Sequence, residues 1–226
     1  MSIRYRTAAL TVFSLLCAGT VLAADYRVEP LDEGPPADEV SEEIMAAVAP
    51  TGVKVIRGTK RTVCDIWLCK EWAVKPDFTA TSEVLYPFTP GQLIGLVRFK
   101  RKTPDFRDQE LLRGVYTLRY GQQPVDGNHE GTSPTRDFLM VISAEVDRAV
   151  EPADADTLEA NSSHAAGSNH PAIFCLQTAE GADELPALRE HEDREWTILQ
   201  VVGQAVAGDA RRELQLDLVV VGQAAE

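Results

Sequence analysis

Basic residues are scarce in this chain, and their scarcity narrows the classes of partner that it can bind. Lys and Arg number 22 against 35 Asp and Glu among 226 residues, which gives a formal net charge of −13 at pH 7. Proteins that bind nucleic acid or an anionic membrane surface present a basic face to that partner. The sequence therefore predicts no nucleic-acid partner and favours an acidic, solvated surface.

Long apolar runs and catalytic motifs are also missing. After residue 23, no stretch approaches the roughly 18 apolar residues that a membrane-spanning helix needs, so we expect no membrane span. The chain contains no Gly-x-Ser-x-Gly elbow, phosphate-binding loop, dinucleotide fingerprint or His-Glu-x-x-His motif. These absences favour a protein that is not an enzyme.

Cysteines are few, and beyond the N-terminal segment their number is odd: Cys64, Cys69 and Cys175. On an unbroken strand Cys64 and Cys69 would lie about 16 Å apart, which is beyond disulfide reach. Either that strand ends between them, or Cys175 forms a disulfide with Cys64 or Cys69 and the remaining thiol is a small buried hydrophobe.

Residues 1–23 have the pattern of a secretory signal peptide. Arg4 and Arg6 precede an apolar core, and Val21-Leu22-Ala23 forms a small-residue cleavage site. Cys17 follows Leu16, where a lipoprotein peptidase needs a small residue, so we exclude a lipoprotein. The sequence predicts a cleaved signal peptide and a periplasmic or secreted protein.

The sequence predicts that the mature chain is an acidic lead-in, residues 24–52, followed by one β-rich domain, residues 53–226. In the lead-in we expect an extended or mobile segment over 25–36 and a short amphipathic helix over 38–48. Beyond it, a period of two predicts strands at 53–57, 62–68, 83–86, 93–100, 114–120, 137–143, 172–177, 195–203 and 212–221. The last two should form a hairpin turned near Gly208 and Asp209.

An insertion at 145–171 interrupts the strands, and within it residues 154–166 are expected to form a helix closed by Gly167. The acidic stretch 180–195 is expected to be a solvated loop. Nine strands with two short helices predict an all-β fold, an antiparallel β-sandwich, because sheets of this size must each bury one face.

The segment Gly114-Val115-Tyr116-Thr117-Leu118 resembles the Gly-x-Tyr-x-Leu strand of secreted immunoglobulin-like and prealbumin-like sandwiches. In those domains the tyrosine hydroxyl often anchors a corner between strands. The wider arrangement, with Tyr86-Pro87-Phe88, Pro90-Gly91 and His170-Pro171, resembles uncharacterised exported bacterial β-sandwich proteins. The resemblance implies export and a sandwich, and it implies no activity.

The loop between the strands at 114–120 and 137–143 carries a pattern typical of calcium loops. Oxygen-bearing side chains stand at its first, third, fifth and twelfth positions and glycine at its sixth: Asp126, Asn128, Glu130, Asp137 and Gly131. Calcium is bound by oxygens at such spacing. The alternative is a turn in which these side chains bond only to the local backbone.

Four histidines, His129, His164, His170 and His191, lie in predicted loops or in the insertion. With Asp126, His129, His164 and His170 would supply ligands for zinc or copper, although their spacing matches no specific metal motif.

These observations favour an exported, soluble, non-enzymatic module that binds an unknown protein or glycan. Its working surface is expected at the 121–136 loop and the 145–171 insertion, because rigid sandwiches place function on loops. Trp72 is the tryptophan expected to be exposed for a sugar or partner. The alternative is a metal-binding protein or metal-dependent hydrolase built from Asp126, His129, His164 and His170.

Overall fold

The structure is a computed structural model and describes residues 25–124 and 135–224. It has strands β1 (Tyr26–Leu31), β2 (Gly52–Arg57), β3 (Arg61–Leu68), β4 (Trp72–Ala73), β5 (Leu93–Phe99), β6 (Thr103–Pro104), β7 (Glu110–Leu111), β8 (Gly114–Gln122), β9 (Asp137–Ser143), β10 (Ile173–Gln177), β11 (Ala187–His191), β12 (Trp196–Ala207) and β13 (Ala210–Val221). The helices are α1 (Glu42–Ala47), α2 (Ala155–Ala166) and the 3₁₀ turn η1 (Glu192–Arg194). The predicted all-β class is confirmed.

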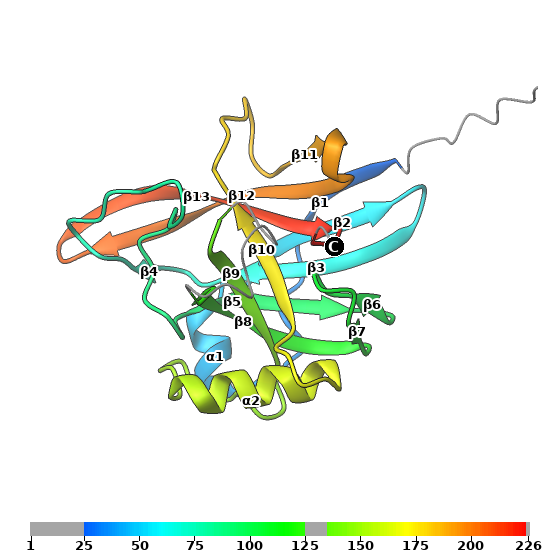
Figure 1. Cartoon of the computed structure of the whole chain (residues 1–226), viewed down its shortest axis with the longest axis horizontal. Helices are drawn as coiled ribbons and strands as arrows, with labels where there is room; N and C mark the ends of the chain where they lie inside the picture. The colour runs from blue at the N-terminus through cyan, green and yellow to red at the C-terminus, as the bar shows by residue number, and fades with distance from the viewer. Residues whose placement is uncertain (1–24, 125–134, 225–226) are drawn as a thin grey trace, which may run out of the picture.

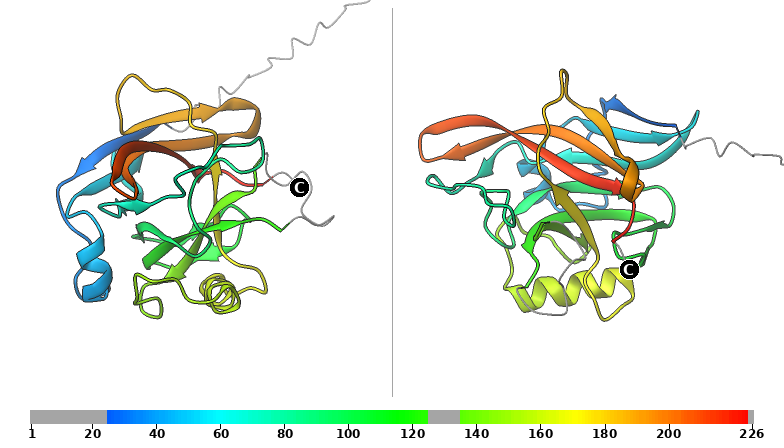
Figure 2. Two further views of the ribbon diagram at one scale, coloured as in Figure 1. Left: turned by 90° about the vertical axis from the view of Figure 1, so that its left-hand side faces the viewer. Right: turned by 45° about the horizontal axis from the view of Figure 1, so that its top comes forward.

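One curled sheet forms the body of the protein (Figures 1 and 2). Ten strands follow one antiparallel path, β1-β2-β3-β5-β8-β9-β10-β13-β12-β11, and β4 adds to β12 in parallel. Its first and last strands, β1 and β11, lie close together, so the sheet curls into a half-barrel. The expected two-sheet sandwich is not confirmed. The inner apolar faces are buried by curvature of one sheet, which strand periodicity alone does not distinguish from packing between two sheets.

The central strands carry the core, as their sequence pattern predicts. On β8, the side chains of Tyr116, Leu118 and Tyr120 all belong to the main apolar cluster. Strand β9 lies between β8 and β10 and is buried on both faces. Its inner side chains join the main core, while Met140 and Ile142 on its outer face pack with Leu158 of α2. The continuous apolar run of β9 is therefore explained by burial on two sides.

Helix α2 begins and ends where the sequence predicts, for local reasons. The Asp154 side chain caps its N-terminus by accepting from the backbone N–H of Thr157 at 3.0 Å, and Gly167 ends it in a left-handed conformation with φ 59°. Ser162 is fully buried, and its hydroxyl lies 3.0 Å from the Val141 carbonyl oxygen. This contact fixes the helix against β9.

The β12–β13 hairpin is confirmed, with Ala207 opposite Ala210 and a turn at Gly208, whose φ is 59°. The hydroxyl of Tyr116 donates to the carbonyl oxygen of Leu112 at 2.8 Å and so fixes the turn that precedes β8. Among the described residues, no helix is long and apolar enough to cross a membrane.

Three predictions of secondary structure are wrong. Residues 26–31, expected in an extended or mobile lead-in, form β1 and pair with β2 along its whole length. The stretch 180–195, expected as a solvated loop, contains β11, which pairs with β12. Residues 83–86 form no strand, because they turn around Thr81, whose hydroxyl accepts from the Val84 N–H at 2.9 Å. Long-range pairing decides the first two cases and a local turn the third.

Of the two alternatives for the cysteines, the structure has the strand ending between Cys64 and Cys69, because β3 ends at Leu68. Cys64 and Cys69 are buried free thiols, so neither is bonded to Cys175. Cys64 lies in β3 and Cys175 in β10, and β5, β8 and β9 separate these strands in the sheet. Both thiols of the β3 region act as small hydrophobes in the main core.

Candidate ligand pocket at the mouth of the curled sheet

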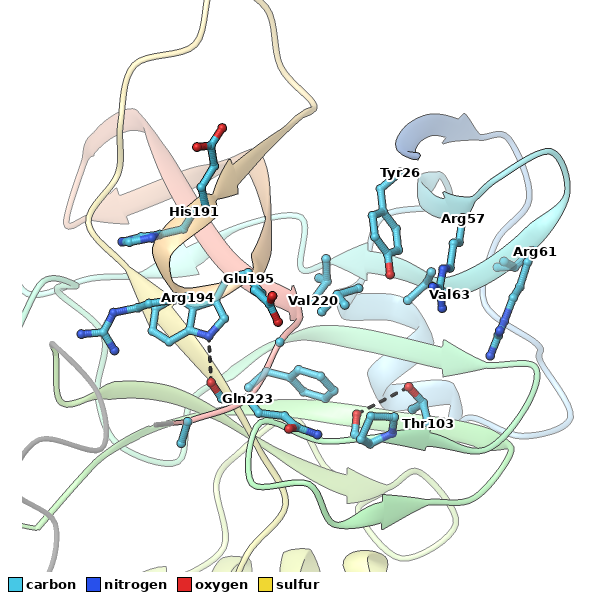
Figure 3. Close-up of a pocket in the computed structure, with 18 of the residues that line it drawn as sticks. Tyr26, Arg57, Arg61, Val63, Thr103, His191, Arg194, Glu195, Val220 and Gln223 are labelled. Atoms are coloured by element: carbon cyan, nitrogen blue, oxygen red, sulfur yellow. Dashed lines mark hydrogen bonds between the residues drawn. The ribbon is translucent and has the colours of Figure 1, made fainter. Parts of the chain in front are cut away.

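Strand ends from distant parts of the sequence meet at one end of the curled sheet. Tyr26 begins β1, Arg57 ends β2 and Arg61 begins β3, while Trp196 begins β12 and Val221 ends β13. Because neighbouring strands are antiparallel, the start of one strand and the end of the next lie at the same end of the sheet. The opening between them is a hollow of about 1160 Å³, which we call the mouth pocket (Figure 3).

The inner wall of the mouth pocket is apolar. Phe174 and Val220 are buried members of the main core, and Val63 packs against the same cluster. In Figure 3 the Tyr26 ring projects from β1 toward the hollow, above Val63 and Val220. A ligand that enters the pocket therefore meets aromatic and aliphatic surface.

A group of cations lines one side of the pocket. Arg57 and Arg61 extend from the β2–β3 hairpin toward the space above Thr103 (Figure 3), and Arg101 and Lys102 follow β5 beside them. The Arg57 guanidinium lies 5.7 Å from the ring centroid of Tyr26. Lys102 is paired with Glu110 at 2.6 Å, whereas the three arginines form no ion pair among the described residues.

The opposite side is built by η1 and the start of β12. Trp196 is held there by its indole N–H, which donates to the Gln223 carbonyl oxygen at 2.8 Å, and by edge contact with Phe106. Arg194 lies over the Trp196 ring at 4.9 Å and, in Figure 3, its guanidinium points away from the hollow. This side also carries three exposed acids, Glu192, Asp193 and Glu195.

A second cavity, of about 640 Å³, lies where the predicted working surface was expected. Its wall includes the end of β8, the start of β9 and residues of the insertion such as Leu158 and His170. The wall stops at Pro124 and resumes at Thr135, the two ends of a range outside the described residues. The mouth pocket, by contrast, is lined by described residues on each side.

The predicted metal ligands fall into two groups. Asp126, Asn128, His129 and Glu130 lie outside the described residues. Asp137 is buried at the start of β9, His164 lies on α2 and His170 follows it. Within residues 25–124 and 135–224, no group of three or more His, Cys, Asp or Glu is placed to hold a metal ion.

The Asp137 carboxylate is engaged inside the protein. One oxygen accepts from the Tyr120 hydroxyl and the other from the Leu85 backbone N–H at 2.6 Å. Burial raises the pKa of this carboxyl above its ordinary value. The same burial, with the hydrogen bond to Asp137, raises the pKa of Tyr120. These contacts give Asp137 a structural role between β8, β9 and the 83–86 segment.

The expected exposure of Trp72 is wrong. Trp72 is fully buried, with its indole N–H donating to the Ile94 carbonyl oxygen at 2.9 Å and its ring against Phe88. Trp67 and Trp196 are buried as well. None of the three tryptophans therefore offers an open platform for sugar stacking.

Sequence reasoning missed the mouth pocket. The cations on its hairpin side, Arg57, Arg61, Arg101 and Lys102, come from two short segments of the sequence, and nothing in the local pattern of either segment links it to the other. The register of β3 against β5 joins them, since Asp65 faces Arg98 and the strand ends beyond that pair lie side by side.

Comparison with family models gives no match, and searches among curated proteins and solved structures likewise give none.

Proposed function

We propose that the protein is an exported, soluble, non-enzymatic binding protein whose ligand is a small molecule held in the mouth pocket. One observation carries the proposal: strand ends from both halves of the sequence assemble a single hollow with a buried apolar wall. Ligand pockets are typically concave and combine apolar wall with a few polar groups, and the mouth of a barrel is a common place for them. The buried tryptophans make a glycan platform less suitable than a pocket ligand.

A neutral fluorescent probe, N-phenyl-1-naphthylamine, tests the proposal because its emission rises in an apolar site. We expect it to bind, and we expect Val63→Trp to weaken binding about tenfold or more, which corresponds to about 1.4 kcal/mol. Val63 is half-buried in the wall of the mouth pocket, so the indole ring of a tryptophan at this position would fill part of the hollow.

The matched control is Ala155→Trp, which adds the same ring at the second cavity. It should leave the affinity unchanged, and thermal melting should show both variants folded. No probe binding to the parent protein, or equal loss in the two variants, would contradict the proposal.

Export rests on residues 1–23, which lie outside the described residues. Mass spectrometry of the protein recovered from outside the inner membrane should find an N-terminus at Ala24. An intact Met1 on that material would contradict a cleaved signal peptide.

A further inference from the structure

We infer that the ligand of the mouth pocket is an amphipathic anion, an apolar body that carries one carboxylate, sulfonate or phosphate group. The inference rests on the proposed function, because it names the chemistry of the ligand at that same site. Three arginines with unused donors, Arg57, Arg61 and Arg101, lie beside an apolar wall at the mouth of the sheet.

The charge of this pocket runs against that of the whole chain. The chain has a formal net charge of −13. The residues that line the pocket include five Lys or Arg and three Asp or Glu, so five minus three leaves an excess of two positive charges. An acidic protein that gathers cations around one hollow creates a local field that attracts anions.

The arginines on the hairpin side are available to a ligand. Arg98, the arginine next to this group on β5, is paired with Glu33 and Asp65, and Arg119 on β8 is paired with Asp147. Arg57, Arg61 and Arg101 form no ion pair among the described residues, and all three are exposed. A guanidinium presents a planar set of donors that matches the two oxygens of a carboxylate or sulfonate.

The position of the acids sets the orientation of the ligand. Glu192 and Asp193 belong to η1, and Glu195 directly follows it. In Figure 3, Glu195 lies across the hollow from Arg57 and Arg61 of the β2–β3 hairpin. An anionic group would be repelled by the η1 side and attracted to the hairpin side. The headgroup therefore lies against the arginines, and the apolar body lies along Val63, Phe174 and Val220.

Two probes of the same shape separate charge from apolar contact. The first is N-phenyl-1-naphthylamine, which is neutral, and the second is 8-anilinonaphthalene-1-sulfonate, which adds a sulfonate to the same rings. We expect the sulfonate to bind more tightly than the neutral probe at low salt, and its advantage should shrink as salt is added.

The test variant is the triple substitution Arg57→Gln, Arg61→Gln, Arg101→Gln. Glutamine keeps a polar side chain but removes the charge and the paired donors. We expect the affinity for the sulfonate to fall about tenfold or more, since it loses charge-assisted hydrogen bonds, while the affinity for the neutral probe stays within about twofold.

The matched control is Arg113→Gln, Arg148→Gln, Arg212→Gln. These three arginines are also exposed, form no ion pair among the described residues and do not line the mouth pocket. The control changes the net charge by the same amount but alters no side chain of the pocket, so it should leave the affinity for both probes unchanged.

The outcomes distinguish this inference from the proposed function. Equal loss of sulfonate binding in both triple variants would overturn the inference, because net charge alone would then explain it. Sulfonate binding that survives in the pocket variant, together with intact binding of the neutral probe, would overturn the ligand class and leave the pocket standing. Failure of both probes to bind the parent protein would overturn the proposed function itself.

Discussion

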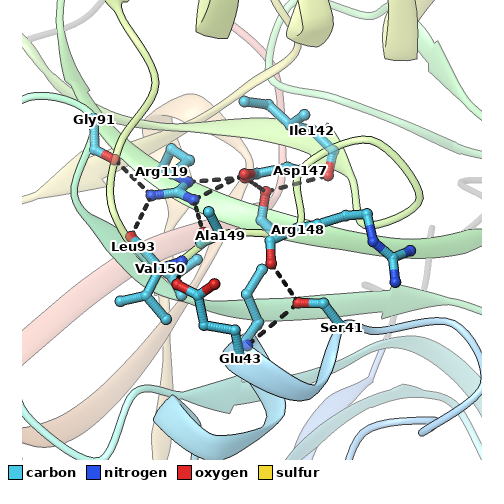
Figure 4. A network of polar contacts seen from close by, with 12 residues as sticks. Ser41, Glu43, Gly91, Leu93, Arg119, Ile142, Asp147, Arg148, Ala149 and Val150 are labelled. Atoms are coloured by element: carbon cyan, nitrogen blue, oxygen red, sulfur yellow. Dashed lines mark hydrogen bonds and ion pairs between the residues drawn. The ribbon is translucent and has the colours of Figure 1, made fainter.

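Arg119 is fully buried in β8, and its removal is the sharpest test of how the insertion is held to the sheet (Figure 4). The guanidinium forms a two-point ion pair with Asp147, with both N–O distances at 2.8 Å. The remaining donors reach the carbonyl oxygens of Gly91 at 3.0 Å, Val150 at 2.9 Å and Ala149. All five N–H groups are therefore used, and they join β8 to the start of the insertion and to the loop before β5.

The substitution Arg119→Met removes every one of these donors and leaves the Asp147 carboxylate beside a buried apolar side chain, with only the Thr117 hydroxyl among its side-chain donors. Breaking a buried ion pair by removing one partner costs about 3–5 kcal/mol. We expect Arg119→Met to lower the free energy of unfolding by that amount. Adding Asp147→Leu should recover part of the loss, because no buried charge then remains, but the three carbonyl oxygens stay without their donor.

Urea unfolding followed by tryptophan fluorescence measures these changes, since all three tryptophans are buried. The control is Arg211→Met, which breaks the pair of Arg211 with Glu71 at the protein surface, where side-chain exposures are 59% and 47%. A surface pair contributes about 0–1 kcal/mol. If Arg119→Met cost no more than Arg211→Met, the argument that this network anchors the insertion would be refuted.

Three further predictions concern the core and its titratable groups. Burial raises the pKa of the Asp105 carboxyl above its ordinary value of 3.8. At pH values between the ordinary pKa and the raised pKa, the folded state therefore holds more protons than the unfolded state. Urea unfolding at several pH values would compare the free energy of unfolding of the parent protein with that of Asp105→Asn. The difference in favour of the parent protein should fall as pH rises through that range, and a difference that grows with pH would contradict a raised pKa for Asp105. A Cβ at Gly203 would lie 2.4 Å from Cη2 of Trp72, so Gly203→Ala should destabilise the protein by about 1–3 kcal/mol in thermal or urea unfolding, and an unchanged stability would refute the close contact. Burial raises the pKa of Cys69 to about 12 and that of Cys64 as well, so neither thiol should react with an aromatic disulfide reagent until the protein unfolds; reaction at the rate of an exposed thiol would contradict their burial.

Local signals made part of the fold predictable. The cap at Asp154, the glycine at 167 and the turn at Gly208 each act within a few residues, and the structure places helix and hairpin ends at them. The alternation of β8 likewise predicted that Tyr116 and Leu118 face the core. These elements are determined by backbone geometry and side-chain period, which a short window of sequence contains.

The remaining features depend on partners that are distant in sequence. Arg119 occupies the face of β8 opposite Tyr116 and Leu118, which alternation assigns to solvent, yet residues 147–150 cover it and supply its acceptors. Strand β1 has no periodic signal and is held by its pairing with β2. Curling of the sheet into a half-barrel is a property of ten strands together, and the sequence of a single strand does not predict it.

The candidate site likewise depends on residues that are distant in sequence. The predicted working surface combined the 121–136 loop, of which residues 125–134 lie outside the described residues, with the 145–171 insertion. The mouth pocket is instead assembled from residues scattered between 26 and 224. Its arginines look like ordinary surface residues in the sequence. Only the register between strands shows that they share one hollow.

The most direct test of the mouth pocket is to locate a bound probe by NMR. Backbone amide shifts of the ¹⁵N-labelled protein would be followed while 8-anilinonaphthalene-1-sulfonate is added. The largest changes are predicted at residues 57, 61–63, 101–104, 191–196 and 220–224, which line the mouth pocket. Changes concentrated instead at α2 and the outer face of β9, or spread evenly over the sheet, would contradict the account.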